Sequence, residues 1–382
     1  MDVLHDCCAG LDVHKKTVVA CVRRVHPAGK VSKTIKTFAT MTGDLLALAD
    51  WLGAQGVATI AMESTGSYWK PVFNILESRF TVILVNAHHI KQVPGRKTDV
   101  KDREWIAQLL QHGLLRSSFI PPQSTRQLRD LTRQRTQLVG QKTAVANRIA
   151  KVLEDANIKL GSVASEVLGV SGRAMIEAII RGEYDPVKLA NLARRRLRGK
   201  IPQLQLALRG SVTEHHRFLL RTQMDHLLHL EAMIRRYEER IEEALPPTGE
   251  PMTHLMTIPG VDIRVAQVVL AEIGQDMDQF PTAGHLSSWA GLASGNHESA
   301  GKRQSGRTTP GNRWLKTALV QAAWAASRAR KTHLAKKFVR IARSRGQKRA
   351  AIAVAHTLLV IIYHLLKEKT TYQERSDQNE AA

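Results

Sequence analysis

The first 120 residues alternate between apolar strand patterns and amphipathic helix patterns. Three strand segments come first, CCAGLDV, TVVACVRRV and VSKTIKTFAT, and the short connections HKK and PAGK join them. Such short connections are typical of neighbouring antiparallel strands. A helix over GDLLALADWLGAQG follows, then the strand VATIAME, a helix from about Tyr68 to Glu77, and the strand FTVILVN. Helices that connect strands in this way indicate parallel pairing.

Three meandering strands followed by alternating helices and strands have the order of an RNase H-like fold. We therefore expect an α/β domain of this class over residues 1–120. Its boundary falls where the segment PPQS, from Pro121, interrupts the chain and a long polar helical pattern begins at about Thr125.

Two long helices with heptad repeats are predicted within residues 121–249. Leucine or a β-branched residue recurs every seven positions in each of them. The first repeat comprises Leu131, Leu138, Val145 and Val152, and the second comprises Leu220, Leu227, Ile234 and Ile241. These repeats predict a helical coiled-coil linker, either an antiparallel arm within the chain or a dimerising coiled coil. Short helices between them carry the run ARRRLRGK, for which a solvated surface and a phosphate contact are equally compatible interpretations.

Residues 250–368 are expected to form a mainly α-helical C-terminal domain. IPGVDIRVAQVVLAEIG has the form of a helix-hairpin-helix, whose turn aims backbone amides at a phosphate. Asp262 stands where a second glycine is usual, so phosphate contact and plain helix packing both stay open. The helix AGHLSSWAGL, the polar basic loop ASGNHESAGKRQSGRTTPGN and two further helices follow. The tail, residues 369–382, is expected to be disordered.

The apolar segment at 350–366 raises the question of a membrane span. It is shorter than the roughly 20 residues that a bilayer requires, contains His356 and His364, and has Lys and Arg on both flanks. We expect a buried helix and no membrane association. Because MDVLHD lacks the basic and apolar parts of a signal peptide, a cytoplasmic location is expected, with Cys7, Cys8 and Cys21 as reduced core residues.

Charge then narrows the class of partner. Lys and Arg number 56 against 34 Asp and Glu, which gives a formal net charge of +22. Such an excess of positive charge favours a polyanion, above all nucleic acid, as the partner.

Four carboxylates carry the candidate chemistry of this basic chain. Asp12 and Glu63 lie at the ends of two predicted strands, and Asp99 and Asp102 open the helical segment DVKDREWIAQLLQHG. Because Asp99 and Asp102 are three residues apart, one helix face carries both of them toward the strand ends. Hydrolysis or transfer at a phosphodiester uses Mg²⁺ held by several carboxylates. As single residues, each has an ordinary structural role, such as a favourable acid at a helix N-terminus; the combination predicts a metal site.

The local contexts of these acids resemble a known family. GLDVHKKT, MESTGSYW and KTDVKDREWIAQLL, together with PGVDIRVAQVVLAEIG, SWAGLASGNHESAGKRQSGR and LLVIIYHLL, are similar to motifs of the DEDD transposases of bacterial insertion sequences, the insertion-sequence one-ten family, related to Piv-type invertases. The resemblance covers nearly the whole chain and is weakest in the central helices. It implies a RuvC-like catalytic domain at 1–120, a coiled-coil linker at 121–249 and a serine-containing transposase domain at 250–368.

The resemblance also implies residue roles. Asp12, Glu63, Asp99 and Asp102 would hold Mg²⁺, with Mn²⁺ as an alternative, and Ser299 would attack the DNA phosphate. From the residues alone, Ser294, Ser299 and Ser305 lie in the same basic loop, and an ordinary loop role is open for each. Lys302, Arg303 and Arg307 follow Ser299 and suit contact with the scissile phosphate. His297 is a candidate base, and Ala300 stands where the family often has glycine.

The partners implied by the resemblance are double-stranded donor and target DNA, an element-encoded guide RNA, and further copies of the chain in a dimer or tetramer. The expected function is Mg²⁺-dependent transposition or site-specific recombination. Two alternatives remain: an endonuclease of the Holliday-junction resolvase type that uses metal and water only, and a noncatalytic nucleic-acid-binding scaffold.

Overall fold

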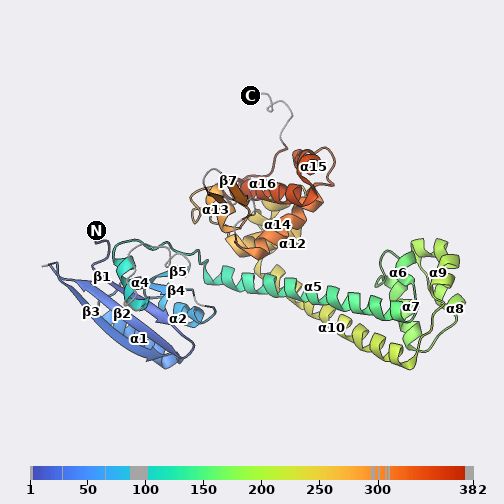
Figure 1. Cartoon of the computed structure of the whole chain (residues 1–382), viewed down its shortest axis with the longest axis horizontal. Helices are drawn as coiled ribbons and strands as arrows, with labels where there is room; N and C mark the ends of the chain where they lie inside the picture. The colour runs from blue at the N-terminus through green and yellow to red at the C-terminus, as the bar shows by residue number, and fades with distance from the viewer. Residues whose placement is uncertain are drawn as a thin grey trace. The chain divides into compact units, whose positions relative to one another are not determined.

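The computed structural model describes residues 3–27, 29–64, 66–86, 102–293, 297–299, 302–305, 308 and 310–374, with the backbone alone at 297–299 and 302–305. The chain divides into two compact units, Met1–Ile120 and Pro121–Ala382. Both units are shown in Figure 1.

The first unit is built on a mixed sheet of five strands with the order β3-β2-β1-β4-β5. Strands β1, β2 and β3 pair antiparallel, whereas β4 and β5 run parallel to β1. The α/β class and the pairing expected from the sequence are thereby confirmed. The strands are β1 Cys7–Val13, β2 Thr17–Val25, β3 Val31–Ala39, β4 Thr59–Glu63 and β5 Thr81–Val85.

Helices cover both faces of this sheet. On one face, α1 (Thr42–Ala54) and α2 (Trp69–Leu76) share a core with alternate residues of β1, including Ala9 and Leu11. On the other face, α4 (Asp102–Gln111) packs against Cys8 of β1 and Ala61 of β4. Because side chains alternate across a strand, these two cores fix which face each β1 residue occupies.

The cysteine side chains of the described part are free. Cys8 and Cys21 are buried and Cys7 is half-buried. Burial raises the pKa of the Cys8 thiol to about 12, so this thiol stays protonated at neutral pH.

The second unit begins with two long helices, α5 (Gln123–Asp155) and α10 (Glu214–Ala244), which pack side by side and run in opposite directions (Figure 1). Between them lie α6 Leu160–Val163, α7 Val170–Ile180, α8 Pro186–Ala190, the 3₁₀ helix η1 Arg195–Lys200 and α9 Ile201–Ala207. The basic run ARRRLRGK falls largely in η1, which buries none of its residues.

The heptad positions of the two long helices differ in burial. All four in α10 are buried, Leu220, Leu227, Ile234 and Ile241. In α5, Leu138 and Val145 are buried, whereas Leu131 and Val152 are half-buried and Thr132 and Arg135 are buried instead. The first turns of α5 also pack against α12 (Ile263–Ile273), which shifts the buried face there.

The rest of the second unit is mainly helical, as expected, with α11 Glu250–Met256, α12 Ile263–Ile273, α13 Ala283–Trp289, α14 Arg313–Ala326, α15 His333–Arg345 and α16 Gln347–Glu368. The expectation of only two helices after the basic loop was wrong, because α15 is a separate helix. The expectation of a plain loop was also incomplete: β6 (His297–Ser299) and β7 (Lys302–Ser305) form a small antiparallel hairpin. Its polar residues lack the apolar alternation that marks a strand in a sequence.

Among the described residues, α16 is the helix that has the length and hydropathy of a membrane span. More than half of its apolar window is buried inside the unit. It packs against α14, α15 and α13, as a core helix of a globular domain does. The described part of the tail ends at residue 374, and 375–382 lie outside the described residues.

The turn between α11 and α12 favours helix packing over phosphate contact. The Asp262 carboxylate accepts a hydrogen bond from the Val265 amide at 2.8 Å and so caps α12 itself. An ideal Cβ on Gly260 would lie 2.5 Å from the Ala322 carbonyl oxygen, so this turn rests directly on α14. A carboxylate at the helix N-terminus opposes the approach of an anion.

Candidate catalytic site

Two of the predicted carboxylates lie side by side at the ends of adjacent parallel strands. Leu11 of β1 is paired with Met62 of β4, and Asp12 and Glu63 come directly after these partners. Both acids lie on the α4 side of the sheet, because Cys8 and Ala61, which share their faces by alternation, belong to the core under α4. The strand register alone therefore places Asp12 and Glu63 next to each other, at the C-terminal ends of the two strands and on the same face of the sheet.

Helix α4 brings Asp102 to the same end of β1. An ideal Cβ on Gly10 would lie 2.5 Å from the Ala107 amide nitrogen and closer still to the Arg103 carbonyl oxygen, so the helix backbone rests directly on β1. At the other end of α4, the Gln111 carbonyl accepts a hydrogen bond from the amide of Leu4, just before β1. The helix thus runs opposite to β1, and Asp102, its first residue, lies toward the strand end that carries Asp12.

The environments of the three acids differ. The Asp12 side chain is 26% exposed, and its Oδ2 lies 3.3 Å from Nε2 of His14, which is 60% exposed. Glu63 is half-buried. Asp102 is exposed at the N-terminus of α4, where the helix dipole favours a carboxylate. His14 is a neighbour that the sequence analysis missed; its place two residues after Asp12, just beyond the strand, was the available signal.

The carboxylates are suited to a hard cation but do not form a closed metal site in the described part of the chain. Within it, no group of three or more His, Cys, Asp or Glu side chains lies close enough together to hold a metal ion. Asp99 lies outside the described residues. Asp12 and Glu63 offer carboxylate oxygens, the ligands that Mg²⁺ prefers, with Asp102 at the overlying helix end. The metal assignment stays a prediction.

The predicted nucleophile lies on the β6–β7 hairpin. Ser299 ends β6 and is paired with Lys302, the first residue of β7, while Glu298 is paired with Arg303 and His297 with Ser305. The backbone therefore sets Ser299 and Lys302 opposite each other beside the tip of the hairpin. Ser294 and Arg307 lie outside the described residues, and Ala300 does so as well.

The two ends of the serine loop, residues 292–310, are held together at its base. An ideal Cβ on Gly311 would lie 2.5 Å from Cα of Gly291 and closer still to its nitrogen, so these two backbones are in direct contact. The Asn312 amide donates to the Trp289 carbonyl at 3.2 Å. The Asn312 side chain caps α14 by accepting hydrogen bonds from the amides of Trp314 and Leu315.

A buried carboxylate connects this base to α5. Glu272 of α12 is 0% exposed. Its Oε1 accepts from Arg133 Nε at 2.7 Å, and its Oε2 accepts from Arg133 Nη2 at 2.8 Å and from Asn312 Nδ2 at 2.6 Å. Arg129 Nε lies 3.3 Å from the same carboxylate. Burial among these cations lowers the pKa of the Arg129 guanidinium from its usual range. We call Glu272, Arg129, Arg133 and Asn312 the Glu272 network.

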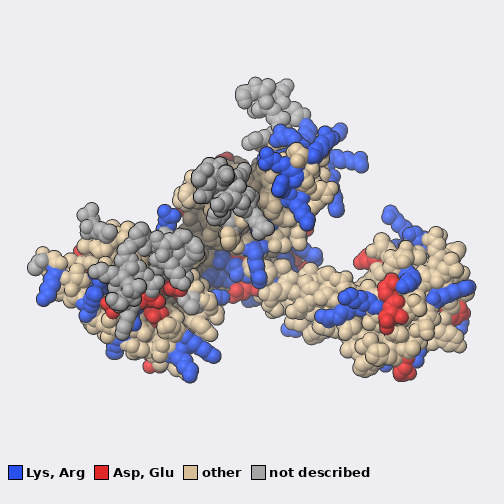
Figure 2. Space-filling view, viewed as in Figure 1, with Lys and Arg blue, Asp and Glu red and all other residues tan. Residues whose placement is uncertain are grey.

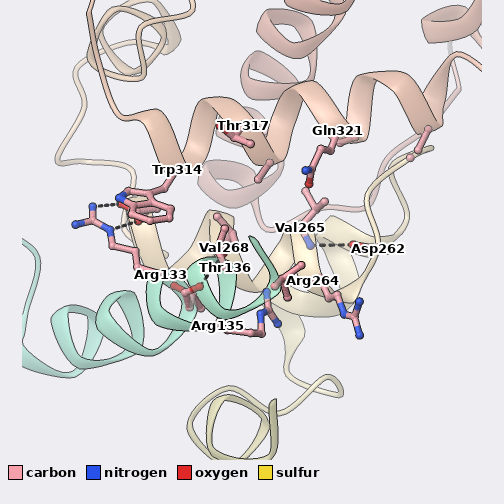
Figure 3. A pocket seen from close by; sticks show the side chains of 17 residues that line it. Arg133, Arg135, Thr136, Asp262, Arg264, Val265, Val268, Trp314, Thr317 and Gln321 are labelled. Carbon is pink, nitrogen blue, oxygen red and sulfur yellow. Dashed lines mark hydrogen bonds and ion pairs between the residues drawn. The ribbon is translucent and has the colours of Figure 1, made fainter. Parts of the chain in front are cut away.

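A cavity of about 300 Å³ lies beside the network, between α5, α12 and α14 (Figure 3). Arg133 and Trp314 face each other at one end of it, with the guanidinium carbon 5.8 Å from the ring centre. Arg135 at the floor of the cavity donates to Gln267 at 2.7 Å. The sequence analysis missed the Glu272 network; a single acid within the apolar run QVVLAEIG was its signal.

Two models of a known protein family match the chain. A family model described as "Transposase", of the DEDD type in IS110, matches residues 9–158 and so includes all four predicted acids. A second, described as "Transposase IS116/IS110/IS902 family", matches residues 252–340, which include Ser299 and Glu272. The chain belongs to the IS110 family of transposases. It is therefore an enzyme of the DNA-transposing and recombining class, and the resemblance stated from its motifs is confirmed.

Individual relatives agree with this family. The chain is 27% identical over 323 residues to a "Probable family 20 transposase" of Pseudomonas aeruginosa. The matched region covers 82% of this chain and 85% of the relative. It is 27% identical over 326 residues to the "Transposase for insertion sequence element IS1111A" of Coxiella burnetii, covering 83% and 80%. A "Pilin gene-inverting protein" of Moraxella bovis is 30% identical over 159 residues, 40% of this chain and 48% of that protein.

Proposed function

We propose that the chain is a Mg²⁺-dependent DNA transposase or site-specific recombinase whose first unit is an RNase H-like, RuvC-like domain. Its strand order, with β1 central and Asp12 at its end, is the order expected of that fold. The single observation that carries the proposal is the β1–β4 register, which makes Asp12 and Glu63 neighbours on the face that α4 covers. A neighbouring pair of acids in a chain of net charge +22 is suited to a metal beside a nucleic-acid phosphate.

Asp12, Glu63 and Asp102, with Asp99 from outside the described residues, would hold the metal. The bound cation would supply charge stabilisation to the phosphate and lower the barrier to attack by a hydroxyl. The second unit would supply the nucleophile, Ser299, with Lys302 and Arg303 of the same hairpin and Arg307 beyond it as phosphate contacts.

The proposed step conserves the phosphodiester. The Ser299 oxygen forms a bond to phosphorus while the bond from phosphorus to one deoxyribose oxygen breaks, and the proton lost by the serine hydroxyl is balanced by protonation of the leaving oxygen. A hydroxyl of a second strand then attacks the phosphoserine and releases Ser299. Since no water enters, strands are exchanged without net hydrolysis, which is what distinguishes recombination from cutting.

Further partners are part of the proposal. The double-stranded DNA substrates are donor and target, and an element-encoded guide RNA would add a second polyanion, for which the positive charge is suited. Because recombination joins two DNA partners, we propose assembly into a dimer or tetramer. The acids and Ser299 lie in different compact units of the chain.

Replacing Ser299 tests the proposal against its alternatives. Ser299→Ala should abolish strand exchange and the covalent protein–DNA adduct seen on denaturing gels, whereas the matched control Ser305→Ala, on the same hairpin, should retain both. Cleavage that survives Ser299→Ala would favour the resolvase-type endonuclease. Asp12→Asn should abolish adduct formation; if DNA-dependent activity were unchanged, the acids would be structural and the noncatalytic scaffold would be the better interpretation.

A further inference from the structure

The C-terminal part of the second unit carries a surface of unpaired positive charge. From Ser299 to Lys367 the sequence contains no Asp or Glu. Within that stretch, eight exposed side chains surround α15, and we call them the α15 basic surface. They are Arg328, Arg330, Lys331, Arg340, Arg343, Arg345, Lys348 and Arg349. Figure 2 shows Lys and Arg gathered over this helix.

The exposed face of α15 carries part of this surface, and the rest lies next to the two ends of the helix. Leu334, Ala335 and Phe338 turn the other face of α15 into the core, where Phe338 packs on Trp324 at 5.2 Å between ring centres. Arg340 and Arg343, three residues apart, share the exposed face. At Gly346, whose φ of 84° suits glycine, the chain turns into α16 and brings the next basic residues beside the end of α15.

Several arginines elsewhere in the second unit are paired with carboxylates, whereas the eight cations of the α15 basic surface have no such partner among the described residues. Arg133 binds Glu272, Arg173 binds Glu231 at 2.6 Å, and Arg264 binds Glu238 at 2.8 Å. Among the residues that the structure describes, no ion pair joins any member of the α15 basic surface to an acid. Neighbouring like charges repel, and a bound polyanion would relieve this repulsion.

We propose that the α15 basic surface binds the phosphodiester backbone of duplex nucleic acid. Exposed cations that are clustered along and beside one helix are suited to a duplex, which carries one phosphate per 3.4 Å of each strand. The contact would position the duplex and read no sequence, because Lys and Arg bind phosphates of any sequence. An anionic lipid surface is disfavoured, because the apolar residues of α16 are buried in the unit. The site is distinct from the serine hairpin with Lys302 and Arg303.

The inference rests on the proposed function only for the class of partner, and binding is measured without any reaction. The full-length chain with the three substitutions Arg340→Gln, Arg343→Gln and Arg349→Gln loses three charges from the surface. We call it the α15 variant. The matched control Arg148→Gln, Arg235→Gln, Arg236→Gln removes three exposed, unpaired charges from α5 and α10. Fluorescence anisotropy with a labelled DNA duplex, and with an RNA duplex of the same sequence, is followed from low to high salt. Thermal unfolding checks that both variants fold.

We expect the α15 variant to bind at least one of the two duplexes about tenfold more weakly at low salt, and the slope of log affinity against log salt to fall by about 2 to 3, since each lost contact contributes about 0.9. The duplex that is affected identifies the partner as DNA or RNA. An equal loss in the control variant would mean that net charge alone sets affinity and would overturn the proposal. Unchanged binding of both duplexes by the α15 variant would also overturn the proposal.

Failure of the proposed function is distinguishable from failure of this inference. Ser299→Ala and Asp12→Asn should bind the duplex as the unchanged chain does. If strand exchange persists in these two variants while the α15 variant binds the duplex more weakly than its control, the catalytic assignment is wrong and the α15 basic surface stands. If they lose strand exchange and the α15 variant binds normally, the surface assignment is wrong while the catalytic assignment stands.

Discussion

Glu272→Gln should destabilise the second unit more than the loss of any exposed ion pair in it. Every polar neighbour of the carboxylate is a donor: Arg133 donates to both oxygens, and Asn312 donates to Oε2. An amide of the same shape offers only one oxygen, and its NH₂ group must face one of these donors. The substitution therefore removes the charge that balances two guanidinium groups and also introduces a donor that meets another donor.

The magnitude follows from burial. Removing one partner of a buried ion pair costs about 3–5 kcal/mol. Arg129 is 14% exposed and regains little water, whereas Arg133 is 32% exposed and regains some. We therefore expect a loss of about 2–4 kcal/mol in the free energy of opening this part of the unit. The proper comparison is Glu238→Gln, because its partner Arg264 is 64% exposed and exposed pairs contribute only about 0–1 kcal/mol.

Native-state hydrogen exchange is the suitable assay, because the chain has two units and a single unfolding transition cannot be assumed. Exchange of the α12 and α14 amides gives the local opening free energy in each variant. The DNA strand-exchange activity should fall as well in Glu272→Gln, since the Asn312 side chain at the base of the serine loop loses its hydrogen-bond acceptor. A destabilisation no larger than that of Glu238→Gln would refute the reasoning.

The remaining predictions concern the two other places where the structure sets a position sharply. Gly10→Ala should displace α4 from β1, destabilise the first unit by about 1–3 kcal/mol and reduce DNA strand exchange. The control Gly43→Ala should leave the stability of the first unit unchanged, because a Cβ at this position meets nothing within 4 Å. Urea unfolding measures the difference between the two variants. Hydrogen bonds from Arg173 and Lys142 lower the pKa of Glu231 to about 2. The contribution of Glu231 to stability should therefore be present above about pH 4 to 5 and be lost as pH falls toward about 2. In Glu231→Gln, hydrogen exchange of the α7 and α10 amides should lack this pH dependence. The same pH dependence in the variant and in the unchanged chain would contradict the assignment.

The sequence predicts the parts of this molecule that depend on local periodicity. Short β-rich apolar segments predicted the five strands, and the ends of two of them predicted Asp12 and Glu63 as neighbours. The Glu272 network escaped prediction because Arg133 and Glu272 are 139 residues apart, and no local pattern pairs them. The hairpin that carries Ser299 was missed because its residues are polar on both faces, and α15 was missed because its positive charge hides the short apolar face formed by Leu334 and Phe338.

Both halves of the proposed site are positioned by contacts of residues other than those proposed to take part in the reaction. In the first unit, the absence of a Cβ at Gly10 lets α4 rest on β1 and bring Asp102 toward the end of that strand. In the second, the contact between Gly311 and Gly291 closes the base of the serine loop, and Glu272 fixes Asn312 there. Asp12 is partly exposed and Asp102 is exposed, so substituting them removes a proposed metal ligand without removing a core contact. A loss of strand exchange in Asp12→Asn with unchanged stability would therefore report on chemistry, whereas Gly10→Ala and Glu272→Gln report on the scaffold that positions it.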